Sequence, residues 1–453
     1  MRILFALLIS ISTFGQDFAS MAREEAEITD IRLSREVATD IMLRPADWNI
    51  SATKYAVKPG DRLILTGDRK EIEFHDLQGT AEKPILITSL APIKIGAKNP
   101  GGRVMMFSNC QYVRLTGDPD GNGSMNIVIN GGGQAVDFRD LSQHVEADHL
   151  DITTGYSGIN VKTDPSCDPK TWRGNFVLDG VYLHHNRVST KMGEGFYVNE
   201  SHYNSVGAIQ GGPCANGATT AQEHEGKNVL IEDNVIVTSG ADGIQVGAVI
   251  TGTCVIRRNT VLKYGTANGW GQTAGIILNP GTIADVYDNR IDTGTGFAIQ
   301  DQGPGGSKIH DNLILNPGMG GVMSVVYQIA GFTTTDTDQI YNNTIINAKG
   351  SALEYYSAVT FKNNLYQLAA GAVPYKKGGS SGVLTESGNT QLSGISGMLD
   401  ASYAPIAGLV PAGVGYKPIP VIVKEAARAE LVIENGIESW YLISDSGKRK
   451  KIE

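Results

Sequence analysis

A short unit of sequence recurs through the middle of the chain, and it limits the folds that the chain can adopt. The unit reads apolar-x-x-Asn-x-apolar, and an earlier copy at 147–152 has His149 in place of the asparagine. The asparagines of the unit are Asn186, Asn234, Asn259, Asn289, Asn312, Asn343 and Asn364. Successive members lie 48, 25, 30, 23, 31 and 21 residues apart, and the first gap is either two steps or one step with an insertion. Periods of this length are typical of solenoid proteins.

A second short strand follows each unit after a glycine-rich turn. These strands are predicted at 158–161, 195–198, 243–246, 275–278 and 296–299. No connection has the pattern of an amphipathic helix, which excludes a helix-crossed α/β sheet. The sequence therefore predicts an all-β coil whose rungs stack ~4.8 Å apart. The asparagines would then form an internal ladder that hydrogen-bonds to neighbouring turns, which is a structural role.

These rungs, with their asparagines and their glycine-bounded second strands, resemble the right-handed parallel β-helix proteins of the pectin-lyase-like superfamily over residues 55–417. The resemblance implies a right-handed coil and, for many secreted members, action on acidic polysaccharide. It also leaves room for hydrolases, epimerases and non-catalytic rods such as phage tail spikes and adhesins. The Asp-Asp pair of the polygalacturonase-like hydrolases is missing, so no subfamily is indicated.

The two ends of the chain differ from the repeat region. Residues 1–16 read as a secretory signal peptide, and 17–54 as an N-terminal arm or cap. Residues 418–453 are predicted to hold a β-hairpin centred on Asn435-Gly436. We therefore expect an exported protein, secreted, periplasmic or on the cell surface, with no membrane segment after signal cleavage.

Composition excludes several classes of protein. The chain has 38 Lys and Arg against 47 Asp and Glu, a net charge of −9, and no long basic stripe, which argues against nucleic-acid binding. Apolar residues make up 41% of the chain, enough for a core. Its 55 glycines lack a three-residue period, so a collagen-like fold is excluded.

The alternation of inward and outward residues in the second strands predicts a polar surface. One outward row is predicted to hold Asp137, Asn160, Tyr197, Gln245, Ile277 and Ala298, and a second row Arg139, Lys162, Asn199, Gly247, Asn279 and Gln300. The first three rungs concentrate the charged and polar members of both rows. This density predicts a site on rungs 135–200.

The residue types of this site suit elimination on an acidic polysaccharide. We expect Arg139 to hold the sugar carboxylate, Lys162 to act as base if Arg139 depresses its pKa, and Tyr197 to give or relay a proton. The predicted substrate-binding residues are Asp137, Asn160, Asn199, Glu200 and Gln245. A hydrolase using Glu194 or Glu200 with Asp137 or Asp242 is an alternative. A non-catalytic carbohydrate-binding rod is a further one.

Two long loops leave the coil beside these rungs. They span 163–175 and 201–227, and each contains one cysteine. We expect a disulfide between Cys167 and Cys214 in an oxidising compartment, and buried thiols at Cys110 and Cys254.

The sequence patterns that would indicate a metal site are weaker than those for the polysaccharide site. Asp118, Asp120 and Asn122 match the start of a calcium loop, but Ile129 stands at the position of the bidentate glutamate. A tight turn is therefore the favoured interpretation, with calcium as a possible cofactor. Adjacent strand residues point to opposite faces, so we expect no zinc at 184–185 or at 223–225.

Overall fold

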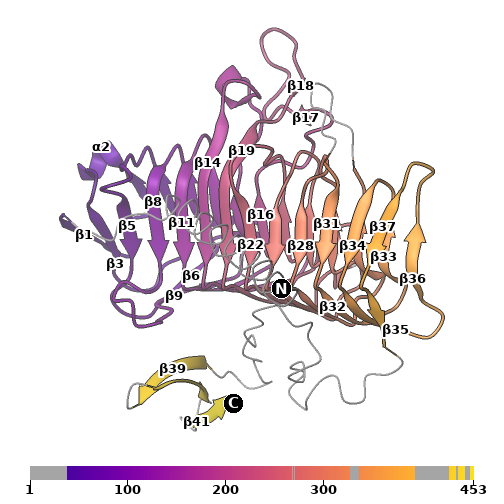
Figure 1. The fold of residues 1–453 in the computed structure, drawn as a ribbon. Coiled ribbons are helices and arrows are strands. Elements are labelled where there is room, and N and C mark those ends of the chain that lie inside the picture. Colours follow the sequence, from indigo (N-terminus) through magenta and orange to yellow (C-terminus); the bar gives the residue numbers. More distant parts are fainter. Residues whose placement is uncertain are drawn as a thin grey trace, which may run out of the picture.

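The computed structural model describes residues 38–267, 269, 271–326 and 336–392, and three strands between 428 and 452. In 38–392 the chain winds into a coil whose wall consists of three parallel β-sheets (Figure 1). The all-β parallel β-helix predicted from the repeat is therefore confirmed. Parallel pairing at the rung spacing satisfies the backbone of each interior strand by its two neighbours, which is why such short strands are stable here.

The strands of the three sheets alternate along the chain. Sheet A is β1 (Asp40–Leu43), β3 (Arg62–Leu65), β5 (Ile85–Thr88), β8 (Gln111–Thr116), β11 (Gln143–Asp148), β14 (Val177–His184), β19 (Glu225–Glu232), β22 (Cys254–Arg257), β25 (Asp285–Tyr287), β28 (Lys308–His310), β31 (Asp338–Tyr341), β34 (Val359–Lys362) and β37 (Leu384–Ser387). Sheet B is β2 (Asn49–Ser51), β4 (Ile72–His75), β7 (Arg103–Ser108), β10 (Gln134–Arg139), β13 (Ser157–Val161), β16 (Phe196–Val198), β21 (Ile244–Val246), β24 (Ile276–Leu278), β27 (Ile299–Asp301), β30 (Gly320–Ser324), β33 (Ser351–Tyr355) and β36 (Val373–Lys377). Sheet C is β6 (Ile93–Gly96), β9 (Ile127–Asn130), β12 (Leu150–Thr154), β15 (Arg187–Thr190), β20 (Val235–Thr238), β23 (Thr260–Leu262), β26 (Arg290–Asp292), β29 (Leu313–Leu315), β32 (Thr344–Ala348), β35 (Leu365–Leu368) and β38 (Thr390–Gln391).

A few elements lie outside the three sheets. They are the helix α2 (Ala52–Tyr55), the 3-10 helix η1 (Pro169–Thr171), and the antiparallel pair β17 (Gly207–Ala208) and β18 (Thr220–Ala221). No helix in the described residues has the length and hydrophobicity that crossing a membrane requires.

The register of sheet B confirms the predicted outward row over five rungs, from Asp137 to Ile277. Asp137 pairs with Asn160, Asn160 with Tyr197, and Tyr197 with Gln245. The predicted row is wrong by two residues at β27, because Ile277 pairs with Gln300 and not with Ala298. Strand β27 begins only at Ile299, after the glycine-rich turn.

The ladder of asparagines is confirmed, and it runs unbroken from Asn186 to Asn364. Each side-chain oxygen accepts the backbone N–H of the asparagine one rung before it, at 2.9–3.1 Å. Asn389 extends the ladder by one further rung. Asn186 bonds directly to Asn234, so the gap of 48 residues is one rung with an insertion.

The predicted alignment of His149 with the asparagines of the repeat is wrong. Asp148 pairs with His184, so His149 aligns with His185 and not with an asparagine. Leu150 takes the ladder position, and its backbone N–H donates to Asn186 Oδ1 at 3.1 Å.

A stack of phenylalanines fills the earlier rungs of the core. Phe74 and Phe107 have ring centroids 4.8 Å apart, and Phe107 and Phe138 4.4 Å apart. All three side chains are fully buried. The core thus has aromatic rings on its N-terminal side and asparagines along the turns of its later rungs.

The boundaries of the coil differ from the prediction at its start. Strand β1 pairs with β3, and β2 pairs with β4, so the sheets begin at Asp40 and not near residue 55. The expected signal peptide and the expected end of the coil at 417 lie outside the described residues. In the tail, β39 (Arg428–Glu434) pairs antiparallel with β40 (Ile437–Ile443), which confirms the hairpin, and β41 (Arg449–Ile452) adds a third strand.

Candidate functional site

Lys162, just after the end of β13, lies at the centre of a group of charged side chains. Its Nζ is 2.5 Å from Asp164 Oδ1, 3.8 Å from Glu200 Oε2 and 4.8 Å from the centre of the Tyr197 ring. Burial disfavours the ammonium, but Glu200, Tyr197 and Asp164 outweigh it and raise the pKa of Lys162. The ammonium is therefore held in its charged form.

Glu200 lies behind Lys162 and is 1% exposed. Burial raises the pKa of this carboxyl to about 8, although the Lys162 ammonium opposes the shift. Glu200 therefore holds its proton more tightly than an exposed glutamate does. A protonated carboxyl in such a position is a candidate general acid.

Two further buried acids precede the neighbouring strands β16 and β21. Glu194 is 1% exposed and Asp242 is fully buried, and they occupy the same position on adjacent rungs. Burial raises the pKa of both, that of Asp242 to about 8, and the charge of Glu194 adds to the shift of Asp242. We call Lys162, Glu194, Tyr197, Glu200 and Asp242 the outer-face cluster.

Buried polar atoms without a hydrogen-bond partner gather at this cluster. They include Glu194 Oε2, Glu200 Oε1, Asp242 Oδ2, Asn160 Oδ1 and both side-chain amide atoms of Asn199. Most buried polar groups in proteins are paired, and each exception calls for an explanation. A polar ligand or ordered water at this face would supply the missing partners.

Arg139 and Asp137 lie at the edge of the cluster and are tied to other groups. Arg139 bonds to Asp140 at 3.0 Å and to Gln210 Oε1 at 3.3 Å, and its Nη1 is 3.9 Å from Asp137. Asp137 accepts a hydrogen bond from Arg103. The hypothesis that Arg139 depresses the pKa of Lys162 is therefore wrong, because Arg139 is engaged by acids while Lys162 faces acids of its own.

The remaining predicted residues lie on the same face but are covered. Asn160, Asn199 and Gln245 are at most 1% exposed, and Gln245 accepts a long hydrogen bond of 3.5 Å from Gln272. Tyr197 is half-buried, its hydroxyl lies 2.8 Å from Ser201 Oγ, and burial raises its pKa to about 12. The structure thus brings the predicted residues together, with Arg139, Lys162 and Tyr197 partly exposed.

The two long loops form a wall beside the cluster. Cys167 and Cys214 are joined by a disulfide, as predicted, while Cys110 and Cys254 are buried free thiols. The wall continues inward to His224, which is fully buried and whose Nε2 accepts the Thr163 backbone N–H at 3.1 Å. Burial lowers the pKa of His224 to about 4, so the ring beside Glu200 is neutral.

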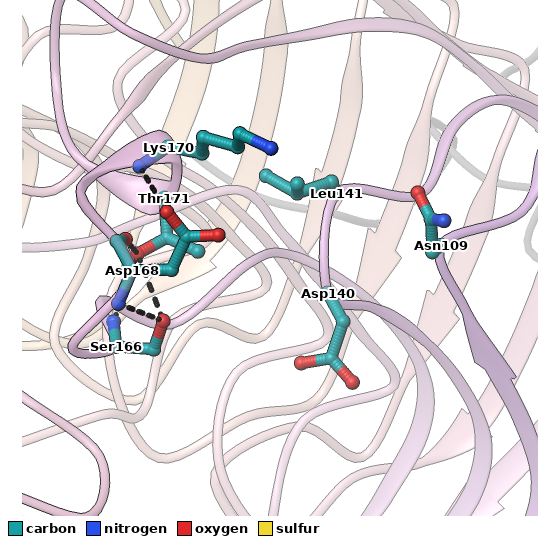
Figure 2. A pocket seen from close by; sticks show the side chains of 7 residues that line it. All are labelled: Asn109, Asp140, Leu141, Ser166, Asp168, Lys170 and Thr171. Atoms are coloured by element: carbon teal, nitrogen blue, oxygen red, sulfur yellow. Dashed lines mark hydrogen bonds between the residues drawn. The ribbon is translucent and has the colours of Figure 1, made fainter.

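A cavity of about 420 Å³ lies between the disulfide-linked loop and the turns after β7 and β10. Figure 2 shows Ser166, Asp168, Lys170 and Thr171 on one side of it and Asn109, Asp140 and Leu141 on the other. Asp140 is also the hydrogen-bond partner of Arg139. The cavity therefore opens next to the outer face of sheet B, one residue from the predicted carboxylate-binding arginine.

The calcium-like stretch is a turn. Asp118 accepts the backbone N–H groups of Asn122 at 3.0 Å and Gly123 at 2.8 Å, as well as the Ser124 hydroxyl. Asp120 and Asn122 are exposed. The favoured interpretation of a tight Asx turn is thus confirmed.

Sequence reasoning missed two contributors to the site. Gln210, in the 201–227 loop, hydrogen-bonds to both Arg139 and Asp164, and no local sequence pattern predicts these contacts. The sequence pattern places Asp164 only in a loop, although it is the closest partner of Lys162. A local signal did exist for Glu194 and Asp242, since each stands directly before the glycine that opens a second strand.

Comparison with known proteins supports the fold and little beyond it. A family model described as periplasmic copper-binding protein (NosD) matches residues 179–378, less than half of the chain. No curated protein matches. The chain is a parallel β-helix protein.

Solved structures with a similar fold are carbohydrate-active enzymes at low identity. The GH136 lacto-N-biosidase from Eubacterium ramulus is 12% identical with a TM-score of 0.44, and the match covers 77% of this chain and 68% of that one. The A-module of the mannuronan C-5 epimerase AlgE6 from Azotobacter vinelandii is 12% identical, TM-score 0.30, covering 81% and 99%. The PL6 alginate lyase AlyGC is 15% identical, TM-score 0.31, covering 85% and 60%.

Proposed function

We propose that this protein is an exported enzyme that cleaves a polysaccharide at the outer-face cluster, with Glu200 as the proton donor. One observation carries the proposal. Carboxyl groups with raised pKa values and unpaired polar atoms gather beside a charged lysine on one face of sheet B. Perturbed acids in such a setting are typical of catalytic sites.

A sugar would meet the more exposed members of the site first. The side chains of Lys162 and Asp164 are 19% and 28% exposed, whereas Glu200 lies beneath them at 1%. A sugar carboxylate draws the ammonium of Lys162 outward and opens the way to Glu200. A uronate therefore binds better than a neutral sugar, in keeping with the predicted acidic polysaccharide.

Hydrolysis fits the pair of acids that share Lys162. The Asp164 carboxylate takes a proton from a water molecule that attacks the anomeric carbon. The glycosidic C–O bond breaks as Glu200 gives its proton to the leaving oxygen. One carboxyl that gives a proton and another that takes one are the pair that glycoside hydrolysis uses.

Elimination is the second candidate, and the contact between Tyr197 and Lys162 favours it. The ring of Tyr197 lies 4.8 Å from the Lys162 ammonium, whose charge opposes the burial that raises the pKa of the phenol to about 12. Lys162 would neutralise the uronate carboxylate while Tyr197 takes the proton from the neighbouring carbon. The bond to the leaving oxygen breaks, a carbon–carbon double bond forms, and Glu200 protonates that oxygen.

The test is incubation of purified protein with pectate, alginate and glycosaminoglycans, with and without calcium. New reducing ends would be measured together with the ultraviolet absorbance of unsaturated uronates. Reducing ends with absorbance indicate elimination, and reducing ends alone indicate hydrolysis. Binding to a polymer without either signal would replace the proposal by a non-catalytic rod, which the periplasmic description of the matched family supports.

A matched pair of variants tests the role of Glu200. Glu200→Gln should abolish cleavage and retain binding. Glu354 is a buried glutamate in the row of sheet B that contains Tyr197, and Lys376 binds it at 3.0 Å. The Glu354→Gln variant should cleave normally. Equal activity of the two variants would rule out Glu200 as the proton donor.

A further inference from the structure

A separate group of histidines and acids lies on sheet A, at the ends of β11 and β14. Asp148, His149 and His184 each offer one ligand atom within 4.8 Å of the other two. His185 adds a nitrogen next to them, since its Nδ1 is 2.8 Å from His184 Nδ1. None of these residues belongs to the outer-face cluster.

The left-handed turn after each strand explains why this group could not be predicted from the sequence. His149 and His185 have φ values of 55° and 54°, so the chain bends directly after Asp148 and after His184. The expectation that neighbouring histidines point to opposite faces is therefore wrong for His184 and His185. Rung stacking then brings His149 and His185 face to face, with ring centroids 4.9 Å apart.

Buried carboxylates fix the orientation of two of the rings. His149 Nδ1 lies 2.7 Å from Asp148 Oδ1, and His184 Nε2 lies 3.0 Å from Glu146 Oε1. Such carboxylate–imidazole contacts hold metal-binding histidines in place and select their tautomers. The second nitrogen of His149 lies 3.7 Å from Asp118 Oδ2 and that of His184 lies 2.8 Å from His185 Nδ1, so a bound ion would replace these contacts.

Charge at this position favours a cation. Glu146 and Asp148 are fully buried, and Arg114 binds both, at 3.0 Å and 2.9 Å. These two carboxylates and one guanidinium together carry a formal charge of −1, which favours a positive ion nearby. The side chain of His149 is 16% exposed and His185 is exposed, which gives an ion a path from solvent.

We propose that Asp148, His149 and His184 bind a divalent late transition-metal ion, with His185 as the nearest additional ligand. Imidazole nitrogen with one carboxylate suits Zn²⁺, Cu²⁺ or Ni²⁺ and does not suit calcium or magnesium. The site joins two successive rungs on sheet A. It is independent of the proposed cleavage reaction on sheet B.

The experiment is calorimetric titration of untagged, metal-free protein with Cu²⁺ and, separately, with Zn²⁺. His149→Asn removes one ligand and keeps a residue type that tolerates the left-handed turn. The matched control is His144→Asn, since His144 has the same turn conformation, with φ of 50°, and lies outside the ligand set. We expect one ion per chain, affinity about tenfold or more weaker in His149→Asn, and unchanged affinity in His144→Asn.

A second measurement separates binding at this site from binding elsewhere. The ion should raise the melting temperature of the wild-type protein and of His144→Asn, because it binds the folded state, and should raise that of His149→Asn much less. Equal affinity of His149→Asn and wild type would overturn the proposal. So would wild-type protein that takes up neither ion.

Discussion

The outer faces of sheets A and B both carry buried glutamates, yet the two faces treat them in opposite ways. On sheet A, Glu232 accepts hydrogen bonds from Tyr182 at 2.6 Å, Arg257 at 2.9 Å and Arg258 at 2.6 Å. Burial would raise its pKa, but these partners lower it to about 2. On sheet B, Glu200 has a single cation at 3.8 Å and a pKa raised to about 8. The regular coil can therefore hold a buried acid either as a paired structural charge or as a proton store.

The largest expected effect is on catalysis by sheet B. Replacing Glu200 with Gln removes the proton donor and leaves the shape of the side chain, so the cleavage rate should fall about 10²–10⁴-fold. The rate is measured as reducing ends released per unit time. An unchanged rate would mean that the unpaired acid of sheet B is as structural as the paired acid of sheet A.

The next effect is on the stability of sheet A. Replacing Glu232 with Gln leaves the buried Arg257 without its carboxylate, so the free energy of unfolding should fall by about 3–5 kcal/mol. Urea unfolding measures this change, and the cleavage rate of the folded variant should equal that of the wild type. A loss of activity without a loss of stability would reverse the assignment of the two faces.

The pH dependence of stability sharpens the comparison. The pKa of Glu200 is raised from its ordinary value of 4.5 to about 8 in the folded protein, so between these values the folded state holds more protons than the unfolded state. Its contribution therefore lowers stability as pH rises from 4.5 to 8. Glu200→Gln should remove this slope, raising the urea midpoint at the alkaline end and changing it little at the acidic end. The pKa of His310 is raised to about 9, so its contribution to stability is also lost as pH rises. Both proteins contain His310, so this contribution cancels when the variant is compared with wild type.

The smallest expected effect comes from the wall of loops. Replacing both Cys167 and Cys214 with Ser frees two loops beside the site, one of which carries Asp164. We expect a several-fold rise in KM with a smaller change in kcat, because substrate positioning is loosened while the contact of Asp164 with Lys162 at 2.5 Å is kept. A large fall in kcat would show instead that the loops set the chemistry of sheet B.

The coil itself could be predicted because its signals are local. The repeated asparagine marks one turn per rung, and each side chain bonds to the next rung in the same way, so spacing alone revealed the ladder. The register failed at Phe297 because a glycine followed by apolar residues marks both the turn and the strand. Alignment of His149 failed because the equivalent of Asn186 is Leu150, which lacks an amide side chain.

The chemistry of the site was less predictable because burial is not local. Lys162 and Tyr197 were found from strand alternation, but their pKa values depend on Glu200 and on a loop that returns from residue 201 onward. The sign of the shift at Lys162 follows from which acids reach it across rungs. The histidine group on sheet A likewise depends on left-handed turns that strand alternation does not reveal.

One rung of the coil holds no member of either internal stack. The phenylalanine stack ends at Phe138 and the asparagine ladder begins at Asn186, and the rung of β11, β12 and β13 lies between them. Under tension along the axis, or in mild denaturant, the rod should yield at this seam, and amides there should exchange with solvent before those of the rungs on either side. Asp148 and Lys162 belong to this rung, whereas His184 and Tyr197 belong to the next one, so a bound ion or sugar would hold the two rungs together.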